Sequence, residues 1–132
     1  MVADETARTR AVVAARAAAD KKAHEIIALD VSERLVLTDA FLVASGDNER
    51  QVRSIVDGVD EALHKVGAKA ARKEGLDEAR WVLLDYGDIV VHVQHDEDRE
   101  YYALERLWKD CPEIELPADL YGPADATGDV SA

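Results

Sequence analysis

The sequence lacks several features that define common classes of protein. Its single cysteine, Cys111, cannot form an internal disulfide, which favours the cytoplasm over an oxidising compartment. No apolar run approaches the roughly 18 residues that a membrane-spanning helix needs. Aromatic residues make up only 5% of the 132 residues, so each one deserves separate consideration. These absences predict a cytoplasmic protein without a membrane span.

Basic residues are too few to balance the acidic ones. The chain has 28 acidic and 16 basic side chains, which gives a formal net charge of −12. Phosphate binding depends on Lys and Arg displacing counterions, so this balance argues against direct capture of nucleic acid and favours a basic protein partner. The acidic excess is concentrated in residues 85–115, which hold ten acids and three bases. Charge alone does not separate partner binding from simple solubility.

The residues that are present fit one α/β domain. A chain of this length with 48% hydrophobic residues can bury a single core without disulfides or metals. Residues 8–29 are rich in Ala and show the three- and four-residue apolar spacing of a helix. Asn48 and Gln51 resemble a capping box, so a second helix is expected to begin there and to end at Gly67.

The strand predictions rest on short apolar runs bounded by turn residues. We expect strands at 29–31, 40–44, 81–85 and 89–93, with a short strand and a loop within 68–80. The turn Tyr86-Gly87-Asp88 predicts a hairpin between the third and fourth of these runs. Both hairpin strands are almost continuously apolar, which predicts a sheet covered on much of both faces.

The domain boundaries follow from where the apolar periodicity starts and stops. Asp98 is expected to cap a last helix, which Pro112 cannot continue. Residues 1–9 and the acidic segment 117–132 show no clear periodicity and are predicted to be disordered. The sequence therefore predicts a single folded domain over residues 10–116.

The residue pattern does not favour catalysis or metal binding. Asp85 and Asp88 flank a turn, whereas two carboxylates that share a metal from one strand lie at i and i+2. Residues 45–47 resemble only a fragment of a phosphate-binding loop. His24 and His64 fall on separate predicted helices, and Cys111 has no neighbouring Cys or His to activate it. We expect no catalytic residue, no metal and no cofactor.

The aromatic residues gather in the last third of the domain, among the acids. Trp108 lies on the apolar stripe of the last helix, which favours core packing. Trp81 and Tyr86 stand at the two ends of one strand, where a side chain either packs in the core or leaves it. Exposed aromatics surrounded by acids suit binding to a basic partner. His92 is expected to be a hydrogen-bonded core or interface residue.

Six segments resemble the ribosomal silencing factor family, RsfS, also called Iojap. They are residues 29–32, 38–46, 50–52, 73–75, 81–93 and 99–108. They occur in one order within residues 10–116, and the long run over 81–93 is specific. The resemblance implies a mixed sheet flanked by helices, similar in outline to nucleotidyltransferases but without their catalytic residues.

The resemblance also implies a function and a partner. Such proteins bind ribosomal protein L-fourteen on the large ribosomal subunit, block joining of the small subunit, and repress translation under nutrient limitation. Carried over by motif, the expected partner-binding residues are Trp81, Leu83, Asp85, Tyr86, His92, Tyr101, Tyr102 and Glu105. A sheet edge also allows two free copies to pair as a homodimer. The alternative function is a nucleotide-binding or nucleotidyltransferase-like regulatory domain, which nucleotide and a divalent metal would stabilise against heat.

Overall fold

A five-stranded mixed sheet organises the chain, and a computed structural model describes residues 3–121 of it. The elements in chain order are α1 (Glu5–Asp20), β1 (His24–Asp30), β2 (Ala40–Gly46), α2 (Glu49–Lys65), β3 (Arg72–Glu74), β4 (Trp81–Asp85), β5 (Ile89–His95), α3 (Asp96–Tyr102), α4 (Leu104–Leu107) and the 3-10 helix η1 (Ala118–Tyr121). The strand order is β1-β2-β5-β4-β3. The predicted α/β class with one mixed sheet and flanking helices is confirmed.

The neighbouring strands β2 and β5 are parallel, and the other strand pairs are antiparallel. β2 pairs with β5 in parallel from Ala40 opposite Ile89 to Gly46 opposite His95. β4 and β5 form the antiparallel hairpin that their apolar runs predict. Gly87 in the hairpin turn has φ +91°, a conformation that glycine adopts without steric cost. The sequence thus predicted the hairpin, and pairing with β2 places it at the centre of the sheet.

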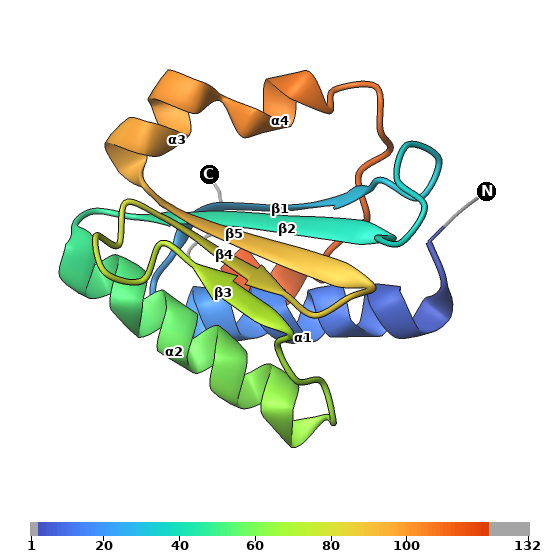
Figure 1. Ribbon diagram of the computed structural model, residues 1–132, viewed down its shortest axis with the longest axis horizontal. Coiled ribbons are helices and arrows are strands. Elements are labelled where there is room, and N and C mark those ends of the chain that lie inside the picture. The colour runs from blue at the N-terminus through green and yellow to red at the C-terminus, as the bar shows by residue number, and fades with distance from the viewer. Residues whose placement is uncertain (1–2, 122–132) are drawn as a thin grey trace.

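The two faces of the sheet are covered by different helices. Figure 1 shows α1 and α2 on one side of the sheet, and α3 and α4 on the other. Side chains alternate between the faces of each strand, so Leu42 and Val91 pack into the main core with the helices α1 and α2. Phe41 and Val90 point the other way and form a smaller cluster with Cys111. Cys111 is buried in this cluster and packs there as a small apolar residue.

The prediction of a helix over residues 8–29 is wrong at both ends. The helix begins at Glu5, where the Asp4 side chain accepts a hydrogen bond from the Thr6 backbone N–H at 2.7 Å. The prediction of disorder over residues 1–9 is therefore wrong from Glu5 onward. The helix ends at Asp20, and residues 24–30 form β1, since pairing with β2 outweighs the helical spacing of Ile26.

The boundaries of α2 agree with the prediction, and those of α3 do not. Asn48 Oδ1 accepts a hydrogen bond from the Gln51 N–H at 2.9 Å, which confirms Asn48 as the cap of α2. Asp98 does not cap a helix; His95 does, because its Nδ1 accepts from the Glu97 N–H at 3.1 Å. Ala103 has φ 46° and separates α3 from α4.

The segment after Pro117 is only partly described. Residues 118–121 form η1, so the predicted disorder of 117–132 does not hold there, and residues 122–132 lie outside the described range. Among residues 3–121, no helix has the length and apolar character needed to cross a membrane. β1 and β3 form the two edges of the sheet. Homodimer formation through an edge stays a prediction.

Candidate partner-binding surface

The sheet face opposite α1 and α2 is left partly open over β4. Alternation along β4 places Trp81, Leu83 and Asp85 on this face, and all three are half-buried. Val82 and Leu84 between them are fully buried in the core. We call Trp81, Leu83, Asp85, Tyr101 and Tyr102 the Trp81 surface, because the two tyrosines of α3 adjoin it.

Trp81 is fixed in place by two contacts. Its Nε1–H donates a hydrogen bond to Nδ1 of His92 at 3.1 Å, and its ring centroid lies 5.0 Å from that of Tyr102. Part of a large aromatic side chain thus stays accessible while its orientation is set. Rigid aromatics of this kind lose little entropy on binding and act as anchors in interfaces.

His92 orients Trp81 from beneath the surface. The side chain is only 5% exposed and meets Phe41 edge-on at 4.9 Å between centroids. Burial lowers the pKa of His92 to about 4, so the imidazole is neutral at pH 7. The hydrogen bond from Trp81 assigns the ring proton to Nε2, since Nδ1 is the acceptor. The expectation of a hydrogen-bonded core or interface histidine is confirmed.

The tyrosines of α3 extend the Trp81 surface toward solvent. Tyr101 is 81% exposed and Tyr102 is 50% exposed. The two rings meet at 4.9 Å with an interplanar angle of 90°, the edge-to-face arrangement that aromatic pairs prefer. Together with Trp81 they form a continuous aromatic chain across the boundary between β4 and α3.

A groove that was not predicted from the sequence lies beside Trp81 and Tyr102. It measures about 590 Å³, and the loop between β3 and β4 contributes Gly75 and Leu76 to its wall. Arg80 and Asp98 also line it and form an ion pair at 2.6 Å. The groove gives the Trp81 surface a concave part that can receive a side chain of a partner.

Tyr86 does not belong to the Trp81 surface. It is 7% exposed, and its hydroxyl donates a hydrogen bond to Asp60 of α2 at 2.6 Å. Burial is the main cause that raises the pKa of Tyr86, and the hydrogen bond to the Asp60 carboxylate raises it further. Burial alone would raise the pKa of Asp60. The hydrogen bonds from Lys73 and Tyr86 stabilise its carboxylate more strongly, so the pKa of Asp60 lies below its ordinary value. The expectation of Tyr86 as an exposed anchor is wrong, because its side chain packs on the α2 side.

Glu105 is already committed to a partner within the chain. Both of its carboxylate oxygens accept hydrogen bonds from Nε of Arg99 at 3.1 Å, and Arg99 is only 4% exposed. The Arg99 guanidinium also donates to the Glu25 carbonyl at 2.7 Å. Glu105 therefore neutralises a buried cation, which leaves it poorly suited to serve as a free charge for a partner.

The two acids that flank the hairpin turn, Asp85 and Asp88, already contact other groups within the chain. Asp85 Oδ1 accepts from the Gly87 N–H at 2.9 Å, while Asp85 Oδ2 lies 3.6 Å from the Arg72 guanidinium. Asp88 pairs with Arg10 of α1 at 2.9 Å. These two carboxylates are thus engaged separately, which agrees with the sequence argument that they do not share a metal. Asp85 remains accessible enough to contribute charge to the Trp81 surface.

Trp108 packs largely as expected. Its ring meets Phe41 at 4.9 Å, and the Arg34 guanidinium lies 4.7 Å from its centroid. The side chain is half-buried and belongs to the smaller cluster beneath α4. It covers the β1 and β2 end of the same sheet face, and the open part over β4 is left to Trp81.

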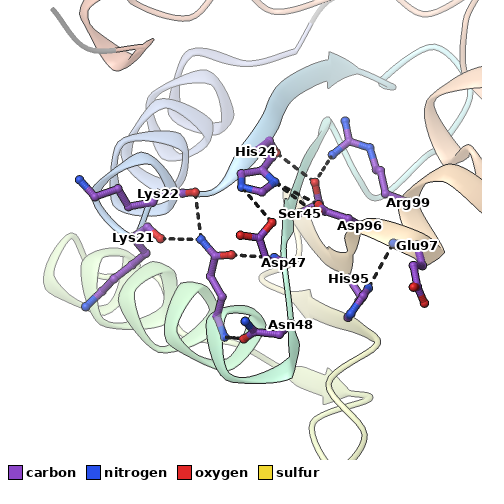
Figure 2. Close-up of polar contacts among 11 residues, drawn as sticks. Lys21, Lys22, His24, Ser45, Asp47, Asn48, His95, Asp96, Glu97 and Arg99 are labelled. Carbon is purple, nitrogen blue, oxygen red and sulfur yellow. Dashed lines mark hydrogen bonds and ion pairs between the residues drawn. The ribbon is translucent and has the colours of Figure 1, made fainter. Parts of the chain in front are cut away.

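A separate polar cluster occupies the end of the sheet near α3. His24 at the start of β1 lies between Asp47 and Asp96, as Figure 2 shows. Its Nδ1 is 3.1 Å from Asp96 Oδ2, and its Nε2 is 3.4 Å from Asp47 Oδ1. This cluster was not predicted, because the apolar spacing around His24 suggested a helix and the three residues come from distant parts of the chain.

Comparison with known proteins identifies the family. A family model described as "Ribosomal silencing factor during starvation" matches residues 4–130. The chain is 43% identical over 104 residues to ribosomal silencing factor RsfS of Bacillus subtilis, covering 79% of this chain and 88% of that protein. It is 31% identical over 112 residues to the chloroplastic protein Iojap of Zea mays, covering 83% of this chain and 47% of that protein.

Solved structures show the same fold. A crystal structure of a Chromobacterium violaceum protein superposes with a TM-score of 0.74 at 38% identity, covering 76% of this chain and 84% of that one. A crystal structure from Bacillus halodurans gives a TM-score of 0.69 at 41% identity, covering 79% and 94%. The relatives are named as silencing factors, which are regulators rather than catalysts. The chain belongs to the ribosomal silencing factor family.

Proposed function

We propose that this chain docks on ribosomal protein L-fourteen of the large ribosomal subunit through the Trp81 surface. The bound domain blocks joining of the small subunit and represses translation in the cytoplasm when nutrients are scarce. The mechanism is occlusion: a folded domain occupies a surface that the small subunit needs. It requires no catalytic group, cofactor or metal, and it depends on the residence of the domain on the large subunit.

The observation that supports this proposal best is the rigid aromatic chain over β4 and α3. Trp81 is held by His92 and Tyr102 while part of its indole stays accessible. Interfaces draw most of their binding energy from a few such aromatic anchors near the centre of the contact. The groove beside Trp81 adds the concavity that an anchor from the partner would fill.

Charge supports a basic partner. Ribosomal proteins bind RNA, so they carry an excess of Lys and Arg, whereas this chain has a net charge of −12. Opposite net charges accelerate encounter and are screened by salt. Asp85, at the end of β4, is the acidic group of the Trp81 surface itself, and we assign it the role of charge partner.

A subunit-joining assay tests the proposal. Light scattering follows the association of purified large and small subunits after the chain is added to the large subunits at saturating concentration. The parent chain should reduce association, and Trp81→Ala should require a much higher concentration for the same effect. Tyr86→Phe serves as the control, because Tyr86 lies on the α2 side of the sheet.

Two results would count against the proposal. Association that proceeds unchanged at saturating parent chain would exclude occlusion as the mechanism. Stabilisation of the chain by nucleotide with a divalent metal, together with turnover lost in Asp85→Asn, would instead favour a nucleotide-binding regulatory domain.

A further inference from the structure

We propose that His24, Asp47 and Asp96 form a binding site for one divalent transition-metal ion, with Zn²⁺ as the best-suited ion. Each residue offers one ligand atom, and these atoms all lie within 4.8 Å of one another. A single ion binds only one imidazole nitrogen, so the site uses either Nδ1, which lies 3.1 Å from Asp96, or Nε2, which lies 3.4 Å from Asp47. The oxygen of the other carboxylate then completes the set from within the same 4.8 Å limit. The cluster is separate from the Trp81 surface.

The ligand types select the class of metal. One imidazole nitrogen and two carboxylate oxygens suit Zn²⁺ and similar borderline ions, whereas Ca²⁺ and Mg²⁺ prefer oxygen ligands alone. Two carboxylates also balance the charge of a divalent cation. Within the described residues, the Asp96 carboxylate hydrogen-bonds to His24 and the Asp47 carboxylate forms an ion pair with the same ring, so coordination would replace contacts inside the cluster.

The backbone around His24 is shaped to present the imidazole. Lys22 and Glu25 on either side have φ of 66° and 50°, which L residues adopt only at a cost. The pairing of β1 with β2 is irregular between His24 and Ile27, a bulge of the kind that re-aims side chains. Arg99 stabilises this bend by donating a hydrogen bond to the Glu25 carbonyl.

A second residue positions Asp47. Gln51 Oε1 accepts from the Asp47 N–H at 2.6 Å, and Gln51 Nε2 donates to the carbonyls of Lys21 and Lys22 at 3.2 and 3.0 Å. One amide therefore ties the turn that holds Asp47 to the turn that precedes His24. The ligands are held by these supporting contacts before any ion arrives.

The site has room for further ligands and links three elements. His24 and Asp96 line a hollow of about 440 Å³, which leaves space for water to complete the coordination shell. His24 begins β1, Asp47 follows β2, and Asp96 is the first residue of α3. A bound ion would therefore fasten the start of α3 to the edge of the sheet.

Calorimetric titration of the full chain with ZnCl₂, after treatment with EDTA and dialysis, tests the site. We expect one Zn²⁺ per chain with a Kd in the micromolar range or tighter, and a rise in Tm of several degrees at saturation. Asp47→Asn, Asp96→Asn and His24→Gln should each weaken binding by about tenfold or more. MgCl₂ at the same concentration should not compete.

Matched controls separate this site from other zinc ligands. Asp57→Asn and His64→Gln change exposed residues of the same types on α2 and should bind Zn²⁺ like the parent. Asp47 is exposed in a turn, so Asp47→Asn should fold even if the other two variants do not. Absence of saturable binding in the parent overturns the proposal, and so does equal affinity in Asp47→Asn and the parent.

Discussion

The neutral state of buried His92 predicts a specific loss of stability in acid. In the folded chain burial lowers the pKa of His92 to about 4, whereas an unfolded histidine has a pKa of about 6.5. Between these two values the unfolded chain binds a proton that the folded chain does not. Stability therefore falls as the pH decreases from about 6.5 toward 4, because protons favour the unfolded state.

The size of this effect follows from the difference between the two pKa values. One pKa unit corresponds to about 1.36 kcal/mol, so the drop to about 4 makes His92 responsible for roughly 3 kcal/mol across this range. A typical domain has about 5–15 kcal/mol of total stability. Protonation would also remove the Nδ1 acceptor and release the indole of Trp81.

Urea denaturation at a series of pH values from 7 to 4 measures the effect. His92→Asn removes the titrating ring but keeps a side-chain oxygen near the Nδ1 position, so it should start less stable and depend less on pH. The difference in unfolding free energy between parent and variant should shrink by about 3 kcal/mol on acidification. His64→Gln, at an exposed histidine of α2, should follow the parent. A difference that stays constant with pH would refute the burial argument.

Three further substitutions test side-chain packing and backbone conformation. Tyr86→Phe should cost about 2 kcal/mol of unfolding free energy, because Asp60 loses a buried hydrogen-bond donor, and large-subunit binding should not change. Gly75→Ala should destabilise by more than about 2 kcal/mol, since φ is +84° and the new Cβ would overlap the Trp81 carbonyl oxygen. Gly67→Ala, at φ +85° with open space around it, should cost only about 1 kcal/mol. Denaturation curves of each variant check these values.

The elements that local sequence determines could be predicted. The hairpin β4–β5 follows from two apolar runs joined by a short turn, because its contacts are close in sequence. The helix α2 follows from its Asn48 cap and its apolar stripe. β1 could not be predicted, since Ile26 and Ile27 fit a helical stripe as well as a strand, and only pairing with the distant β2 decides.

The site was predictable where strand alternation applies. Trp81, Leu83 and Asp85 are two residues apart and share a face, as the sequence implies. The same alternation places Tyr86 on the opposite side of the sheet from Asp85. The spacing alone therefore indicated that Tyr86 does not share a surface with Trp81, Leu83 and Asp85. The engagement of Glu105 with Arg99 was beyond sequence reasoning, because their geometry depends on the break at Ala103 between α3 and α4.

The affinity of Trp81 variants for purified large subunits tests the central claim most directly. The claim is that the Trp81 surface holds the chain on the ribosome. Removal of a central aromatic anchor costs about 2 kcal/mol or more, so Trp81→Ala should weaken cosedimentation with large subunits about thirtyfold. Asp85→Lys should also bind more weakly, and more so at low salt. Circular dichroism and Tm must show that both variants fold. If both fold and bind like the parent chain, the Trp81 surface is not the docking site.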